Sequence, residues 1–146
     1  MIADEYDILI VDDSPNIRKL ISLILKNEGF SFVEAVNGND ALEKIRLYPA
    51  DLIITDMRMP VMDGFEFLRR LRADTGTHWI PAIGLWSGFR LSSHHAALVD
   101  EWVAKPLIPS RLPDTVRKVL GARRSWTGKK MPSVGNPYFL GIFDWI

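Results

Sequence analysis

Short apolar segments alternate with amphipathic segments along most of this chain, and this alternation limits the folds that the chain can adopt. Each apolar run has few polar positions, which is typical of strands that are buried on both faces. The five runs lie at residues 6–11, 30–36, 51–56, 79–86 and 101–104. Segments with apolar residues at helical spacing follow these runs. Strands that alternate with helices predict an α/β fold, in which helices cover both faces of a parallel sheet.

The expected helices begin and end at residues that commonly mark helix boundaries. Ser14 precedes the first helix as an N-cap, and Gly29 follows its end. Asp63 has a Glu three residues later, which is the spacing of a capping box before the third helix. Residues 91–99 predict only a short fourth helix, and the apolar spacing predicts a last helix over residues 110–120.

Length, charge and cysteine content exclude several classes of protein. The chain has 146 residues, which suits one domain, and its 18 basic and 18 acidic residues give a net charge of zero. No overall field therefore attracts nucleic acid or an anionic membrane. The absence of cysteine excludes disulfides and thiolate metal sites. Because no signal peptide or membrane-spanning run is visible, we expect a cytoplasmic protein that binds neither membranes nor nucleic acid directly.

The composition changes near the C-terminus. Residues 122–146 carry four basic side chains against one acidic side chain, and they end in the apolar sequence NPYFLGIFDWI. We therefore predict a domain over residues 1–121 and a C-terminal extension over residues 122–146, which is too short to be a second globular domain. The extension folds back onto the domain, recruits a partner, or is a disordered remnant. Docking on the domain or on a second copy is favoured, since large apolar patches usually mark contacts.

Charged residues follow three of the expected strands. Asp12 and Asp13 end the first strand, Asp56 ends the third, and Lys105 follows the fifth. In a parallel sheet the carboxyl ends of the strands lie at one edge, where open α/β sheets bind ligands. Three carboxylates at one edge repel each other and favour a cation, and an all-oxygen site suits Mg²⁺. With a lysine beside it, such a site predicts phosphoryl transfer to a carboxylate.

Each of these residues also has an ordinary structural interpretation. The acidic pair Asp12 and Asp13 could cap the following helix, Asp56 could cap a turn, and Lys105 could be a surface lysine. The functional interpretation is favoured because all four residues are expected at the same edge of the sheet.

In these motifs the chain resembles the receiver domain of two-component response regulators. The resemblance covers residues 5–121 and rests on the acidic pair in VDDSP, the motif LIITDMRMPVMDG around Asp56, and Lys105-Pro106. It implies a flavodoxin-like, doubly wound sheet of five parallel strands in the order 2-1-3-4-5. It also implies a cis peptide bond between Lys105 and Pro106.

The resemblance implies a role for each matching residue. Asp56 would accept the phosphoryl group, and Lys105 would pair first with Asp56 and then with the phosphoryl oxygens. Asp13 would bind Mg²⁺ directly, and Asp12 would bind it directly or through water. Asp56 itself and the backbone carbonyl of Arg58 would be further ligands of the ion.

One position departs from the pattern of the family. The family has Thr or Ser at the end of the fourth strand, where its hydroxyl binds the phosphoryl group, whereas this chain has Trp86. Ser87 follows, but neighbouring residues of a strand face opposite sides, so Ser87 does not simply replace that hydroxyl. Trp102 stands where the family has its switching aromatic residue. We interpret Trp86 as a space-filling residue, and we expect altered signal transmission through these three switch residues.

These features predict a single-domain response regulator in two-component phosphorelay signalling. It would be a phosphoprotein and a switch rather than a metabolic enzyme, with Mg²⁺ as its cofactor. A sensor histidine kinase or a phosphotransfer protein would phosphorylate it, and a downstream protein would be its target. A homodimer could form through the face of the fourth helix, fifth strand and fifth helix, or through the extension.

Two other functions are left open. A degenerate receiver would act as a phosphorylation-independent protein-interaction module, and Trp86, the short fourth helix and the apolar C-terminal extension favour this alternative. A Mg²⁺-dependent phosphatase that acts on external substrates has little support, since no separate substrate pocket or cap segment is visible.

Overall fold

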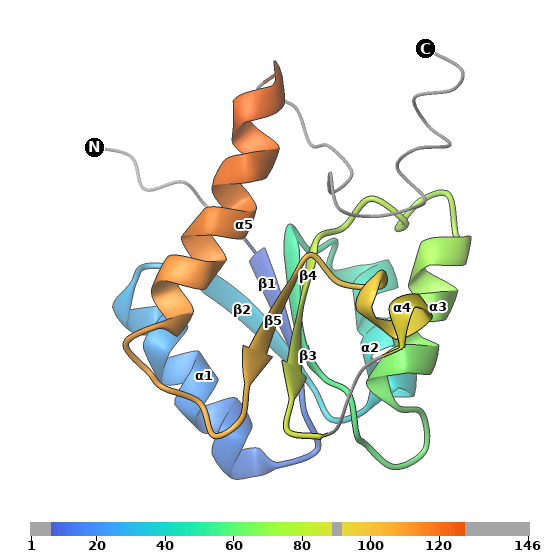
Figure 1. Cartoon of the computed structure of the whole chain (residues 1–146), viewed down its shortest axis with the longest axis horizontal. Helices are drawn as coiled ribbons and strands as arrows, with labels where there is room; N and C mark the ends of the chain where they lie inside the picture. Colours follow the sequence, from blue (N-terminus) through green and yellow to red (C-terminus); the bar gives the residue numbers. More distant parts are fainter. Residues whose placement is uncertain (1–6, 89–91, 128–146) are drawn as a thin grey trace.

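The computed structural model describes residues 7–88 and 92–127, which form one parallel sheet with helices on both sides (Figure 1). Strands and helices alternate along these residues. The strands are β1 (Asp7–Val11), β2 (Ser31–Ala35), β3 (Leu52–Asp56), β4 (Ala82–Trp86) and β5 (Glu101–Ala104). The helices are α1 (Pro15–Asn27), α2 (Gly38–Leu47), α3 (Gly64–Ala73), α4 (Ser93–Ala96) and α5 (Leu112–Thr127).

The strand order is β2-β1-β3-β4-β5, and every neighbouring pair is parallel. This order confirms the predicted doubly wound α/β fold. In the register of the sheet, Val11 lies opposite Thr55, and Asp56 lies opposite Leu85. The ends of β1, β3 and β4 therefore meet at one edge of the sheet, which is the lower edge in Figure 1.

Two apolar layers hold the helices against the sheet. Helices α1 and α5 cover one face, and α2, α3 and α4 cover the other (Figure 1). Ile8 and Ile10 of β1 pack in the layer under α1 and α5, whereas Leu9 and Val11 pack in the layer under α2 and α3. Because successive side chains of a strand enter opposite layers, the strand sequences are apolar throughout. Each fully buried aliphatic side chain contributes about 1.5–3 kcal/mol.

The observed helix starts confirm the caps that the sequence predicts. The Ser14 hydroxyl accepts a hydrogen bond from the N–H of Ile17 at 3.3 Å, at the start of α1. The Asp63 carboxylate accepts a bond from the N–H of Glu66 at 2.9 Å, at the start of α3. Each cap satisfies an N–H that has no partner inside the helix, which stabilises the helix by about 1 kcal/mol.

The prediction for the fourth strand is partly wrong, whereas the prediction for the fourth helix is confirmed. β4 begins at Ala82, so the prediction that the strand starts at residue 79 is wrong. Trp79 lies in a turn, where its indole N–H donates to the carbonyl of Gly76 at 3.0 Å. The short fourth helix is confirmed, since α4 comprises only Ser93–Ala96.

The last helix is longer than the sequence indicates. α5 continues to Thr127, so the prediction of an end near residue 120 is wrong. Gly121 lies inside the helix, where a glycine costs about 1 kcal/mol relative to alanine but does not end the helix. The predicted extension over residues 122–146 thus begins within α5, and its apolar end lies outside the described residues. Among the residues that the structure describes, no helix has the length and apolar character needed to cross a bilayer.

Candidate functional site

Three carboxylates meet at the carboxyl edge of the sheet. One oxygen atom each of Asp12, Asp13 and Asp56 lies within 4.8 Å of the others. Asp12 directly follows β1 and Asp56 ends β3, and these two strands are neighbours in the sheet. Asp12 and Asp56 are buried, whereas Asp13 is exposed to solvent. The cluster is therefore rooted in the sheet and open to water on the side of Asp13.

Lys105 reaches this cluster from the end of β5. Its Nζ lies 3.2 Å from Oδ2 of Asp12 and 3.3 Å from Oδ2 of Asp56. Because β4 separates β5 from β3, the long lysine side chain has to span the end of β4. The backbone N–H of Lys105 donates to the Trp86 carbonyl at 3.0 Å, which ties the residue to β4. The expected cis bond between Lys105 and Pro106 is confirmed.

Burial and neighbouring charges raise the pKa of both Asp12 and Lys105. The rise favours the neutral form of the carboxyl but the charged form of the lysine. Burial raises the pKa of the Asp12 carboxyl, and Asp56 adds to this, while the Ser14 N–H and Lys105 oppose it without cancelling the rise. Burial alone would lower the pKa of Lys105, but attraction by Asp12 and Asp56 outweighs it, so the pKa is raised. Lys105 therefore stays charged and offsets part of the negative charge of the cluster.

The two oxygens of Asp56 have different surroundings. Oδ1 accepts hydrogen bonds from the backbone N–H of Met57 at 2.8 Å and of Arg58 at 3.4 Å. Oδ2 instead faces the ammonium group of Lys105. The backbone thus fixes the rotation of the carboxylate and directs Oδ2 towards the lysine.

Gly64 allows the chain after Asp56 to fold closely against β3. A Cβ atom at Gly64 would collide with the carbonyl of Asp56 and come within 2.8 Å of the Met57 Cα. The N–H of Gly64 donates to the Met57 carbonyl at 3.2 Å. Apolar periodicity does not reveal this close approach of Gly64; the Asp-Gly pair before a helical pattern was the available signal.

The donor set fits a hard divalent cation. Carboxylate oxygens are the ligands that Mg²⁺ takes in proteins, and the exposed side of the cluster leaves room for the waters that this ion retains. Lys105 limits the net negative charge of the site without filling the solvent side, where Asp13 lies. The role of the Arg58 backbone carbonyl as a ligand stays a prediction.

Trp86 lies in a group of aromatic side chains next to the acidic cluster. Its ring makes edge-on contacts with Phe65, at 5.6 Å between centroids, and with Trp102, at 6.5 Å. The guanidinium carbon of Arg58 lies 5.3 Å from the centre of the Trp86 ring. These contacts agree with a space-filling role for Trp86. Ser87 lies one residue beyond β4 and is exposed.

Trp102 occupies space that a glycine provides. Its ring lies so close to Gly84 of β4 that a Cβ there would come within 2.6 Å of Trp102 Cε3. The indole N–H of Trp102 is buried and has no hydrogen-bond partner among the described residues. An unpaired buried donor costs about 1–3 kcal/mol, so the packing of the ring has to offset this cost. A glycine inside a strand pattern is the signal that could have indicated this close approach.

Comparisons with known proteins agree with this geometry. A family model described as the response regulator receiver domain matches residues 8–117. The response regulator GtcR of Aneurinibacillus migulanus is 38% identical over 105 residues, which cover 70% of this chain and 42% of GtcR. The chain spans about half the length of several other curated relatives.

Solved structures of receivers have the same fold. The chemotaxis protein CheY4 of Vibrio cholerae superposes with a TM-score of 0.72 at 32% identity, covering 79% of this chain and 98% of CheY4. The receiver domain of the sensor histidine kinase PA1611 of Pseudomonas aeruginosa superposes with a TM-score of 0.71 at 25% identity, covering 80% of this chain and 98% of the PA1611 domain. That structure holds a magnesium ion in its active site cleft. Since the family match runs from β1 into α5, includes residues of all five strands and covers most of the chain, this chain belongs to the response regulator receiver domain family.

Proposed function

We propose that this chain is a phosphorylatable receiver that accepts a phosphoryl group on Asp56. The observation that carries this proposal is the arrangement of Asp56, whose Oδ1 is held by backbone N–H groups while its Oδ2 faces Lys105 at 3.3 Å. A carboxylate fixed in this way is a preorganised nucleophile, and the lysine can neutralise charge on an arriving phosphoryl group.

The transfer from a phosphohistidine is an in-line displacement at phosphorus. Oδ2 of Asp56 forms the new bond to phosphorus, while the bond between phosphorus and the histidine nitrogen breaks and the nitrogen keeps the electron pair. The ammonium group of Lys105 pairs with the carboxylate before the transfer and with the phosphoryl oxygens after it. Asp12, Asp13, Asp56 and the Arg58 carbonyl would hold Mg²⁺, which when bound supplies positive charge that offsets the charge of the transferred group.

Incubation with acetyl phosphate and Mg²⁺, followed by intact-mass measurement, tests this proposal. We expect a mass increase of one phosphoryl group that is absent in Asp56→Asn. Asp63→Asn is the matched control, because Asp63 caps α3 and should leave the label unchanged. Failure to label with acetyl phosphate and with any competent histidine kinase would contradict the proposal.

In this proposal the chain is a signalling switch rather than a metabolic enzyme. A sensor histidine kinase or phosphotransfer protein donates the phosphoryl group, and the face of α4, β5 and α5 presents the output to a downstream protein. The single-domain organisation, the cytoplasmic location and the homodimer that the sequence suggests stay predictions.

A second function is favoured by the aromatic packing around Trp86. A degenerate receiver would hold Trp102 inward over Gly84 whatever the state of Asp56, and it would bind its partner constitutively. Hydrogen exchange across α4, β5 and α5, with and without acetyl phosphate and Mg²⁺, separates the two functions. A phosphorylation-dependent change in protection supports the switch, whereas labelling of Asp56 without any change supports the interaction module.

A further inference from the structure

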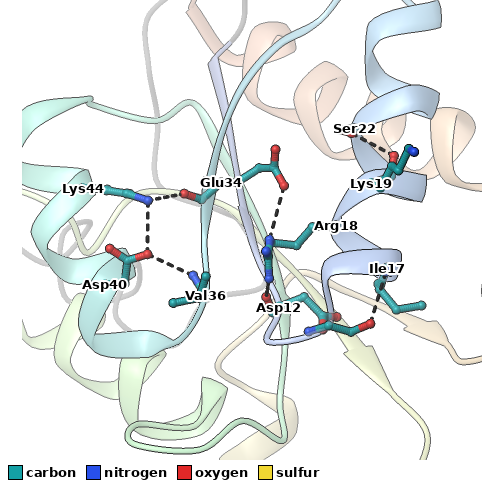
Figure 2. A network of polar contacts seen from close by, with 10 residues as sticks. Asp12, Ile17, Arg18, Lys19, Ser22, Glu34, Val36, Asp40 and Lys44 are labelled. Atoms are coloured by element: carbon teal, nitrogen blue, oxygen red, sulfur yellow. Dashed lines mark hydrogen bonds and ion pairs between the residues drawn. The ribbon is translucent and has the colours of Figure 1, made fainter.

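Arg18 of α1 connects the loop that carries the acidic pair to strand β2 (Figure 2). Its Nη1 donates to the backbone carbonyl of Asp12 at 2.8 Å, and its Nε lies 3.3 Å from Oε1 of Glu34. The Arg18 side chain is only 16% exposed. The guanidinium group is therefore held between the end of β1 and the neighbouring strand.

The carbonyl that Arg18 binds belongs to the peptide between Asp12 and Asp13. The other polar groups of Asp12 also have partners: its N–H donates to the Ala35 carbonyl, Oδ1 accepts from the Ser14 N–H, and Oδ2 faces Lys105. Because a peptide unit is planar, a bond to its carbonyl also fixes the direction in which the chain leaves towards Asp13.

Asp13 depends on this fixed backbone for its orientation. Within residues 7–88 and 92–127, no hydrogen bond or ion pair holds its carboxylate, although one of its oxygens lies in the acidic cluster. Its neighbour Asp12, in contrast, has both carboxylate oxygens bonded. The Asp12–Asp13 peptide is consequently the part of the structure that directs the exposed ligand into the site.

We propose that Arg18 is a positioning residue for the metal site, which acts by fixing the Asp12–Asp13 peptide so that the Asp13 carboxylate points into the cluster. Glu34 supports this role by holding the guanidinium group from β2. The inference rests on the proposed function, because it assigns the cluster to a divalent cation. Groups that orient metal ligands from outside the coordination sphere typically contribute 10- to 100-fold in metal affinity.

The sign of the effect distinguishes positioning from simple electrostatics. Arg18 is positive and lies next to a site for a cation, so removing its charge should tighten Mg²⁺ binding if charge were its only contribution. Removing a positioning group should instead weaken binding. Lys44 provides a matched control, because its Nζ donates to the backbone carbonyl of Glu34 and so belongs to the same polar network, but it contacts neither Asp12 nor the Glu34 carboxylate that holds Arg18 (Figure 2).

The experiment is a titration of the full chain with MgCl₂ alone, in which calorimetry and tryptophan fluorescence each measure the Mg²⁺ affinity. We expect Arg18→Ala to weaken Mg²⁺ binding about 10-fold, while Lys44→Ala binds as tightly as the wild type. Arg18→Lys should recover part of the loss, since an ammonium can still donate to the Asp12 carbonyl. Unchanged or tighter binding by Arg18→Ala would overturn the inference.

Folding and the proposed function are controlled separately. Circular dichroism without Mg²⁺ should show the same fold in all variants. If Arg18→Ala does not fold, Arg18→Met keeps the aliphatic part of the side chain and should weaken Mg²⁺ binding in the same sense, since it also removes the donor to the Asp12 carbonyl. Equal or tighter binding by a folded Arg18→Met variant would then overturn the inference. If the wild type binds Mg²⁺ but is never phosphorylated, the proposed function fails while the effect of Arg18 is still measured.

Discussion

At the scale of single residues, the site places charge where burial is costly. Asp12 is fully buried, next to Asp56, and its pKa is raised because burial disfavours the charged form. Lys105 offsets only part of this cost, since one ammonium group faces two carboxylates. The buried Asp12 carboxylate therefore lowers the free energy of unfolding, while the clustered negative charge favours a cation at this edge of the sheet.

Asp12→Asn should make the protein more stable at neutral pH when no divalent cation is present. The folded-state pKa of Asp12 lies above its ordinary value of 3.8, so the folded state loses stability as the pH rises from that value through the raised pKa. Asparagine does not ionise and avoids this loss, which amounts to about 1.4 kcal/mol for each unit by which the pKa is raised.

Urea unfolding in EDTA at several pH values measures this difference. We expect the gain of Asp12→Asn over the wild type to grow with pH above 3.8 and then level off. Added Mg²⁺ should stabilise the wild type more than the variant, because the variant lacks one candidate ligand. A variant that is less stable than the wild type in EDTA at pH 7 would disprove the argument.

At the scale of elements, close approach of strand backbones to aromatic rings shapes the surroundings of the site. β4 presents Gly84 to the Trp102 ring of β5, and the neighbouring Trp86 ring contacts the same tryptophan. Among the described residues the indole N–H of Trp102 has no hydrogen-bond partner, so packing, rather than hydrogen bonding, positions this ring there. The glycine is therefore needed for the position of the residue that stands at the family's switch position.

Gly84→Ala should displace Trp102 and destabilise the protein by about 1–3 kcal/mol, which is typical of overpacking. A red shift of the tryptophan emission should accompany the loss, as the indole becomes more exposed. Gly121→Ala is the matched control, because a Cβ there meets nothing within 4 Å and the position lies in a helix. This control should gain about 0.5–1 kcal/mol, and equal effects of the two substitutions would show that contact with Trp102 is unimportant.

At the scale of the whole molecule, side-chain contacts at the end of β4 connect the surroundings of Asp56 to β5. Arg58, two residues after Asp56, packs on Trp86, and Trp86 contacts Trp102 of β5. We expect a phosphoryl group on Asp56 to affect β5 through these contacts, although this chain lacks the hydroxyl of the family pattern. If Asp56 is phosphorylated as proposed, we expect Trp86 to influence how strongly the face of α4, β5 and α5 responds.

Trp86→Thr should increase the response of Trp102 to phosphorylation, because it restores the hydroxyl and frees the space around the ring. The measurement is the change in tryptophan emission on adding acetyl phosphate and Mg²⁺, each variant compared with its own unphosphorylated form. Trp86→Phe is the control, since it keeps an aromatic ring without adding a hydroxyl. The same response in all three proteins would exclude Trp86 as a determinant of transmission.

The sequence by itself determined the features that depend on neighbouring residues or on simple topology. Apolar periodicity predicted the alternation of strands and helices, and Ser14 and Asp63 marked helix starts, because caps act within one turn. The meeting of Asp12, Asp13, Asp56 and Lys105 was also predictable, since parallel strands end at the same edge of a sheet.

Only the tertiary structure decided the contacts between distant side chains and the ends of some elements. Periodicity did not reveal that Arg18 binds the Asp12 carbonyl or that Trp102 lies against Gly84, because such contacts depend on how whole elements pack. It also misplaced the start of β4 and the end of α5. Local propensity differs by about 1 kcal/mol at such boundaries, so packing and hydrogen bonding elsewhere in the fold determine where the element begins or ends.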